Sequence, residues 1–184
     1  WQADLPEYFR LCINVSPKQL QKNGFARGVL ALLEYYRLSP GMLELEVTEG
    51  LLLGNSPEVD EQIDVMTAAG IRLSIDDFGT GYASISYLRH YPFSTLKIDK
   101  SFVLDILDDP GDATLVQSVI AMAQALGLRT VAEGVESQAH QHALQALGCD
   151  LMQGYLYSPA VSGTVFIERM QELCMTPPDV FTVQ

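Results

Sequence analysis

The chain has 184 residues, of which 48% are hydrophobic, and it carries a formal net charge of −12. This size and hydrophobic content are sufficient for one substantial core. The acidic charge argues against a DNA or RNA polymer as a ligand, because such partners require clustered Lys and Arg. The sequence has no signal peptide and no apolar run long enough to cross a bilayer. We therefore expect a cytoplasmic protein without membrane contact in this segment, and any tether would lie in upstream domains.

Six short apolar runs recur along the chain, and each ends at a polar or acidic residue. Their spacing is close to the roughly 30 residues that a strand and its crossover helix occupy. We therefore expect six strands, at Cys12–Asn14, Leu43–Val47, Leu73–Asp76, Leu96–Asp99, Thr130–Glu133 and Leu151–Gln153.

Helical patterns fill the stretches between these runs. Ser56-Pro57 predicts a helix start, with serine as the N-cap and proline at the first helical position, and Gly70 predicts its end. Similar helical patterns cover residues 112–127 and 137–148, whereas residues 105–109 are expected to form a solvated loop.

Alternating strands and helices predict a parallel sheet covered by helices. Polar ends on six successive strands favour a barrel, because an open doubly wound sheet gathers such residues at one switch point. The predicted fold class is α/β, a TIM-like (β/α)8 barrel with about six strands present. The chain begins at Trp1 without an earlier strand, so we expect its first strand–helix units to be missing. Residues 1–176 are expected to form this partial barrel domain, and residues 177–184 a C-terminal tail.

Several apolar side chains are expected to pack rather than to carry chemistry. Cys12, Cys149 and Cys174 are odd in number and lack CxxC spacing, so we expect reduced thiols rather than a zinc site. Leu32-Leu33 and Tyr35-Tyr36 are expected to lie in the core or in the barrel shell.

The segment Asp76-Asp77-Phe78-Gly79-Thr80-Gly81 is the most informative one. Two adjacent carboxylates repel each other, so their position at a strand end favours a cation between them. The glycines that follow allow the backbone to turn over a bound group. These features predict a metal site beneath a mobile loop, although the segment taken alone is also typical of a plain turn.

Six motifs stand in the order seen in EAL-domain proteins: Asn14-Val15-Ser16, Glu46-Val47-Thr48-Glu49, Asp76–Gly81, Lys97-Ile98-Asp99, Glu133-Gly134-Val135-Glu136 and Gln153-Gly154-Tyr155. The chain resembles this family over essentially its whole length. The family comprises bacterial phosphodiesterases that cleave cyclic di-GMP to linear pGpG. Its Glu-Ala-Leu signature, whose glutamate is a metal ligand in the family, has no match here and belongs to a strand upstream of Trp1.

The resemblance implies a site for two divalent cations, Mg²⁺ or Mn²⁺. Asn14, Glu46 and Asp76 offer hard oxygen donors from consecutive strand ends. Asp76 resembles the aspartate that bridges two metals, and Asp77 and Glu133 resemble ligands of the second metal. Such a pair of ions activates a water for in-line attack at phosphorus.

The resemblance also implies roles around this metal site. Lys97 resembles the catalytic lysine, which binds the nucleophilic water or offsets transition-state charge. Asp99 is expected to orient Lys97 or a metal-bound water, and Glu133 is the alternative general base. Glu136 and Gln153 are expected to be supporting or substrate-side residues, and Tyr155 is expected to turn its aromatic face toward guanine. Glu49 matches the family glutamate that anchors the loop after the paired aspartates. Gly79 and Gly81 are expected to make that loop flexible.

Each of these residues also has a plain structural interpretation. Asn14 and Ser16 could cap the helix that follows them. Lys97 could place its ammonium in solvent. The acidic pair Glu133 and Glu136 could begin a helix favoured by the helix dipole. Their convergence at one mouth of a barrel is what favours the functional interpretation.

The expected function is metal-dependent hydrolysis of cyclic di-GMP, with two alternatives. One is a catalytically inactive receptor that binds cyclic di-GMP and signals to a partner. The other is a chain that is inactive because the first metal-ligand strand is missing. Expected partners are cyclic di-GMP, a second copy of the chain in a homodimer or strand-swapped oligomer, and sensory or GGDEF-type domains in the full-length protein.

Overall fold

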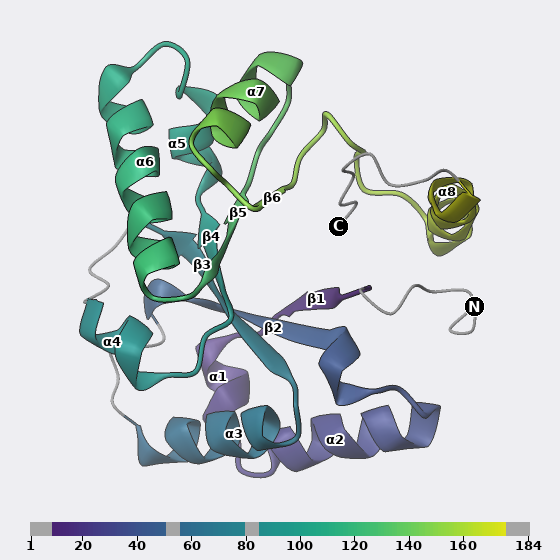
Figure 1. Cartoon of the computed structure of the whole chain (residues 1–184). Coiled ribbons are helices and arrows are strands. Elements are labelled where there is room, and N and C mark those ends of the chain that lie inside the picture. The colour runs from purple at the N-terminus through teal and green to yellow at the C-terminus, as the bar shows by residue number, and fades with distance from the viewer. Residues whose placement is uncertain (1–8, 51–55, 80–84, 176–184) are drawn as a thin grey trace.

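The computed structural model describes residues 9–50, 56–79 and 85–175 (Figure 1). Its six strands are all parallel, and they stand in the sheet in the same order as in the sequence. Sequential order is the arrangement of a barrel wall and differs from the reversed order of a doubly wound sheet. The predicted α/β, TIM-like fold class is confirmed. The strands are β1 (Leu11–Asn14), β2 (Leu43–Thr48), β3 (Arg72–Phe78), β4 (Thr95–Ile98), β5 (Arg129–Ala132) and β6 (Leu151–Met152).

Helices connect successive strands, as the crossover pattern predicts. They are α1 (Pro17–Leu20), α2 (Phe25–Tyr36), the 3-10 helix η2 (Pro40–Met42), α3 (Pro57–Ala68), α4 (Ile85–His90), α5 (Lys100–Leu104), α6 (Pro110–Ala125) and α7 (Gln138–Ala146), with α8 (Gly163–Met175) after β6. Ser56 and Pro57 begin α3 as predicted. The helix α6 begins earlier than predicted, because Asp109 is its N-cap and accepts a hydrogen bond from the Gly111 N–H at 2.6 Å. Among the described residues, no helix is both long and apolar enough to span a membrane.

The two faces of the sheet differ because side chains alternate along a strand. One set of alternating positions is apolar and fully buried, including Leu45, Leu73 and Leu96, and belongs to the same core cluster as Ile63 of α3 and Ile120 of α6. The other set is polar and is also buried; it includes Glu44, Glu46, Ser74, Asp76, Thr95 and Lys97. The polar set therefore lies inside the curve of the sheet.

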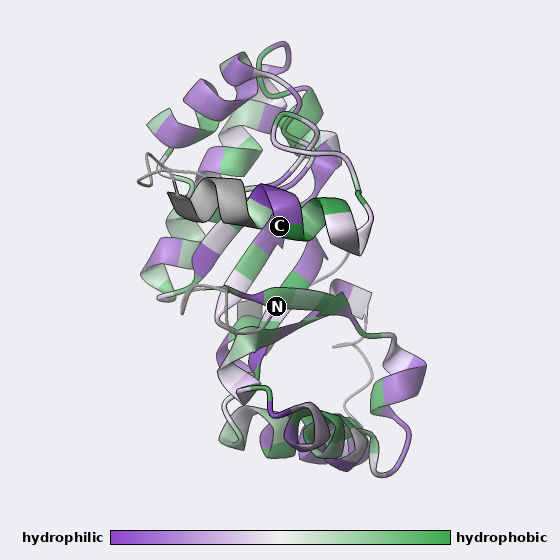
Figure 2. Cartoon of the chain, turned by 90° about the vertical axis from the view of Figure 1, so that its right-hand side faces the viewer, coloured by the Kyte–Doolittle hydropathy of each residue, from purple (hydrophilic) through white to green (hydrophobic). Residues whose placement is uncertain are grey.

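Strand β1 is an edge of the described sheet, and its apolar side chains are exposed. Leu11 and Ile13 are 46% and 44% exposed. Figure 2 views the molecule from this side, with β1 and α8 toward the viewer. Packing of α2 was predicted incorrectly: Leu33 is buried, but Leu32, Tyr35 and Tyr36 lie on its exposed side. Residue type alone does not indicate which helix face is turned outward.

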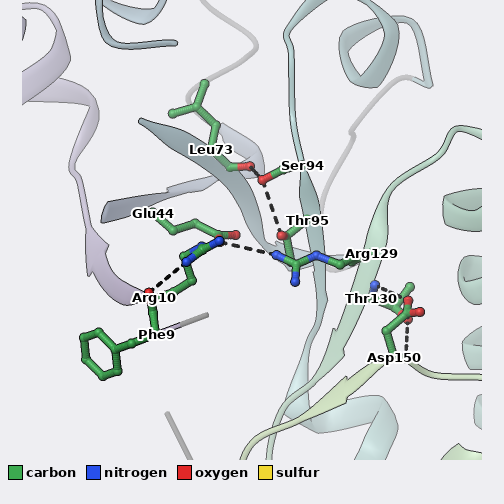
Figure 3. A network of polar contacts seen from close by, with 9 residues as sticks. All are labelled: Phe9, Arg10, Glu44, Leu73, Ser94, Thr95, Arg129, Thr130 and Asp150. Carbon is green, nitrogen blue, oxygen red and sulfur yellow. Dashed lines mark hydrogen bonds and ion pairs between the residues drawn. The ribbon is translucent and has the colours of Figure 1, made fainter. Parts of the chain in front are cut away.

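Polar contacts link β5 to the non-adjacent strand β2 and to Asp150, the residue before β6 (Figure 3). Arg129 at the start of β5 lies 3.8 Å from the buried carboxylate of Glu44 in β2. The Asp150 carboxylate accepts hydrogen bonds from the N–H and the hydroxyl of Thr130, both at 2.8 Å. Because Thr130 is completely buried, Asp150 satisfies polar groups that water does not reach.

We predict that Asp150→Ala lowers the free energy of unfolding by about 1–3 kcal/mol, because it leaves the Thr130 N–H buried without an acceptor. Asp150→Asn is the matched control, since its amide oxygen still accepts. Urea denaturation of both variants and the wild type measures the difference. Equal stability of the Ala and Asn variants would contradict the assigned role.

Candidate metal centre and active site

The polar strand ends identified in the sequence converge at the carboxyl edge of the sheet. Asn14 lies opposite Glu46 in the β1–β2 register, and Thr48 lies opposite Asp76 in the β2–β3 register. Glu133 follows β5 directly, and its N–H donates to the Ile98 carbonyl at the end of β4. Parallel strands place all these ends at the same mouth of the barrel wall.

Lys97 is the centre of this cluster. Its ammonium lies 2.9 Å from Glu46, 3.0 Å from Asp76 and 2.6 Å from Glu133. The residue is only 3% exposed, so the interpretation of Lys97 as a solvent-exposed lysine is wrong. One ammonium on β4 therefore joins carboxylates from β2, β3 and the end of β5.

The charges in this cluster are not balanced. Burial alone would lower the pKa of Lys97, but Glu133 and Glu46 outweigh burial and raise that pKa above its ordinary value. Burial raises the pKa of Glu133 even though Lys97 opposes the shift. Burial also raises the pKa of the Cys12 thiol to about 12, with Glu44 and Glu46 adding to the effect. Negative charge is thus in excess around the ammonium.

A β-bulge explains how two consecutive aspartates reach the same site. Ile75 pairs with Leu96 and Phe78 pairs with Ile98, so Asp76 and Asp77 together lie opposite Lys97. Asp77 has a φ of +54°, a left-handed conformation that is uncommon outside glycine but that Asp tolerates better than most residues. Bulges of this kind re-aim side chains beside functional sites. Here the bulge removes the alternation that would otherwise turn the two carboxylates to opposite faces.

The residues present fit a divalent cation. Among the described residues, one oxygen from each of Asp76, Asp77 and Glu133 lies within 4.8 Å of the other two. Burial raises the pKa of Asp77, and Asp76 and Asp99 raise it further. Carboxylate oxygens are the ligands that Mg²⁺ and Mn²⁺ prefer. A cation would also offset the charge that Lys97 alone leaves uncompensated.

Asn14 and Asp99 stand at the border of the cluster. Asn14 is exposed on the edge strand, and the N–H of the next residue, Val15, donates to the Glu46 carbonyl at 2.8 Å. Asp99 is the N-cap of α5, where it accepts hydrogen bonds from the N–H and the hydroxyl of Ser101. Burial alone would raise the pKa of Asp99, but the hydrogen bonds from Ser101 outweigh burial and lower that pKa. Capping of α5 therefore explains the position of the Asp99 carboxylate without requiring a contact to Lys97.

The other predicted site residues occupy the loops around this edge. Glu49 follows β2 and is buried, whereas Glu136 is exposed. Gln153 follows β6, and its buried side-chain oxygen has no hydrogen-bond partner within residues 9–50, 56–79 and 85–175. Tyr155 is 73% exposed. Gly79 follows β3 with a φ of +99°, and Gly81 lies outside the described residues.

Two glycines in the family-like motifs have a packing role that the sequence reading missed. A Cβ at Gly154 would lie 2.3 Å from the backbone nitrogen of Val135, and a Cβ at Gly134 would lie 2.7 Å from the Lys100 Cβ. Both glycines therefore permit close approach beside Glu133. In the sequence, each of these glycines directly follows a predicted site residue, Glu133 or Gln153, and this placement could have indicated the close packing.

The fold and this cluster define a TIM-like barrel domain with an acidic site at its carboxyl edge. The chain matches the EAL domain model over residues 1–160. It is 36% identical over 166 residues to the cyclic di-GMP phosphodiesterase RocR of Pseudomonas aeruginosa. This alignment covers 90% of this chain and 42% of RocR.

Solved structures agree. The chain resembles the EAL enzyme Bd1971 in its cAMP- and cyclic-di-GMP-bound form, with a TM-score of 0.85 and 34% identity over 88% of this chain and 43% of that one. It resembles a manganese and cyclic-di-GMP complex of Klebsiella pneumoniae BlrP1 with a TM-score of 0.76 and 32% identity, over 82% and 38% of the two chains. The chain belongs to the EAL domain family, and it spans less than half the length of these three relatives.

We predict that Asp77→Asn raises the stability of the metal-free chain at pH 7 by less than about 1 kcal/mol, a small value because the Asp77 side chain, unlike Asp76 and Lys97, is only partly buried. The pKa of Asp77 is higher in the folded chain than in the unfolded chain, so the contribution of Asp77 to stability falls as the pH rises above its unfolded pKa of about 4. Asparagine lacks this penalty and tolerates the positive φ. Thermal unfolding at pH 3 and pH 7 with chelator should show the gain at pH 7 only. A loss of stability at pH 7 would refute the charge argument.

We predict that Lys97→Met destabilises the chain by about 3–5 kcal/mol at pH 7, because buried carboxylates then lose their counter-charge while side-chain volume is kept. The loss should shrink toward pH 4, where the carboxylates take up protons. Lys18→Met, at an exposed lysine of α1, is the control and should stay within about 0.5 kcal/mol of wild type. Urea denaturation at the two pH values provides the measurement. A pH-independent loss would contradict the prediction.

Proposed function

We propose that this chain is the greater part of a domain that hydrolyses cyclic di-GMP to linear pGpG with the help of divalent cations. The observation that carries the proposal is the buried Lys97 ammonium among Glu46, Asp76 and Glu133, with Asp77 brought beside them by the bulge. Membership of the EAL domain family and the phosphodiesterase relative support this substrate. The BlrP1 complex that contains manganese supports the choice of Mg²⁺ or Mn²⁺.

The proposed metal ligands are Asn14, Glu46, Asp76, Asp77 and Glu133. When bound, divalent cations would lower the pKa of a water and offset charge on the phosphate. Asp76 stands in the middle of the cluster, which suits it to contact two cations. Exposure of Asn14 at the edge of β1 leaves its amide oxygen accessible to a ligand.

Lys97 contributes a fixed positive charge at the reacting phosphate. Its ammonium stays protonated near neutral pH, because the neighbouring carboxylates raise its pKa. A fixed charge in a buried site stabilises developing negative charge without reorganisation. Its contacts with Glu46, Asp76 and Glu133 set its position before substrate arrives.

The remaining groups are proposed to act on the substrate side. Tyr155 is exposed and could stack on a guanine. The side-chain oxygen of Gln153, which has no partner in the part of the chain that the structure describes, could accept a hydrogen bond from the ligand. Glu136 is exposed on the same loop as Glu133. Glu49 is proposed to hold the loop after β3.

We predict that cyclic di-GMP hydrolysis requires the acidic cluster and a divalent cation. Turnover should be measured by chromatography for this chain and for a version extended upstream through a Glu-Ala-Leu strand, with Mg²⁺ or Mn²⁺ and with chelator. Asp76→Asn should reduce turnover at least 100-fold, because it removes a central oxygen donor. Asp64→Asn, an exposed aspartate of α3, is the matched control and should have no effect.

Three results would decide between the candidate functions. Turnover that survives both Asp76→Asn and chelator would refute the metal mechanism. Binding of cyclic di-GMP by the extended version without turnover would favour the receptor alternative. Turnover by the extended version but not by this chain would show that the added strand is required for activity.

A further inference from the structure

The short helix α5 lies between the two loops that carry the proposed metal ligands. It follows β4 directly, and it therefore stands between the loop after β3, with Asp76 and Asp77, and the loop after β5, with Glu133. Neither Phe102 nor Lys100 of α5 belongs to the acidic cluster. Both, however, fill the space that a Cβ on a glycine in one of those loops would need.

Phe102 supports the β3 side. A Cβ built on Gly79 would lie 3.1 Å from Cε2 and 3.6 Å from Cζ of the Phe102 ring, and 3.9 Å from Leu115 of α6. The ring is partly buried and packs against the hydrophobic core. Gly79 follows the bulge after a single residue, Phe78. The Phe102 ring therefore limits how far the bulged aspartates can move toward α5.

Lys100 supports the β5 side through its backbone and Cβ. A Cβ on Gly134 would lie 2.7 Å from the Lys100 Cβ and 3.4 Å from its Cα. Gly134 immediately follows Glu133 and has a φ of +73°. The loop that carries Glu133 therefore rests directly on the first residue of α5.

Helix α5 is itself held firmly in place. Asp99 caps its first turn through Ser101, and Val103 is completely buried in the core. The cap and the buried valine restrict rotation and sliding of a helix that would be too short to be stable alone. The two loop contacts thus rest on a fixed element.

We propose that α5 is a spacer that sets the separation of the Asp77 and Glu133 carboxylates, with Phe102 as a positioning residue for the metal site. The consequence for metal binding rests on the proposed function, whereas the restraint on the two loops does not. A separation fixed before binding reduces the entropy that a cation must overcome to gather its ligands. Residues that orient ligands in this way typically change metal affinity 10–100-fold when they are mutated.

The test compares Phe102→Ala with Phe102→Leu and with the matched control Phe25→Ala, a truncation of a partly buried ring in α2. Amide hydrogen exchange of the metal-free chain is measured at residues 76–79 and 133–135. Binding of Mn²⁺ alone is measured from the electron paramagnetic resonance signal of the free ion. Phe102→Ala should accelerate exchange in the β3 loop and weaken Mn²⁺ binding about 10-fold. Phe102→Leu should recover most of both effects, and Phe25→Ala should show neither.

Gly134→Ala tests the β5 side. Its methyl group would overlap the Lys100 Cβ, and we expect it to weaken Mn²⁺ binding by a similar factor. Adding Lys100→Gly removes that Cβ and should restore part of the affinity, although the strain of alanine at a positive φ remains. Lys100→Gly alone provides the reference for the loss of the side chain.

The outcomes separate the spacer from the proposed function. Exchange and Mn²⁺ affinity that are the same in Phe102→Ala and Phe25→Ala would overturn the spacer. Failure of wild type to bind Mn²⁺, together with accelerated exchange in Phe102→Ala, would overturn the metal function and support the restraint on the loops. Absence of recovery in the double variant would overturn the Lys100–Gly134 contact as its cause.

Discussion

The ion pairs of Lys97 are the constraint on which the rest of the site depends. Three acidic side chains from β2, β3 and the end of β5 are withdrawn from water, and each alone would be costly to bury as a charge. A single ammonium reaches all three within 3.0 Å. This is geometrically feasible because β4 lies between β3 and β5 in the sheet. Sequential strand order therefore permits the charge arrangement as well as the barrel.

The same arrangement explains why one face of the sheet buries apolar side chains and the other buries polar ones. Leu45, Leu73 and Leu96 pack under helices, while the intervening positions turn charged and polar groups inward. The bulge at Asp76 and Asp77 interrupts this alternation at one place. Because two residues oppose one, the second aspartate stays near the cluster, at the expense of a left-handed backbone. The irregularity is confined to the two aspartates of the proposed metal site.

The fold could be predicted from the sequence because its units repeat, whereas the site could be predicted only in part. All six strands lie where apolar runs end in polar residues, and Ser56-Pro57 correctly marks the start of α3. The exposure of Tyr35 and Tyr36 to solvent was not predictable, because an aromatic side chain does not by itself show whether another element packs against it. The role of Asp99 as a helix cap depends on where α5 begins, a boundary that patterns locate poorly.

Contacts between segments far apart in the sequence could not be predicted from the sequence. Phe102 and Gly79 are separated by a strand and a helix in the sequence, and no periodicity links them. Charge imbalance is likewise a property of the assembled site. Burial is the largest cause of the raised pKa values of Asp77 and Glu133, and repulsion from neighbouring carboxylates adds to it, so unfolding would relieve both effects. Such repulsion opposes folding in the absence of a cation, and it becomes a source of affinity when a cation binds. Since the bulge keeps Asp77 in this position despite its backbone strain, the acidic cluster is better explained by cation binding than by stability.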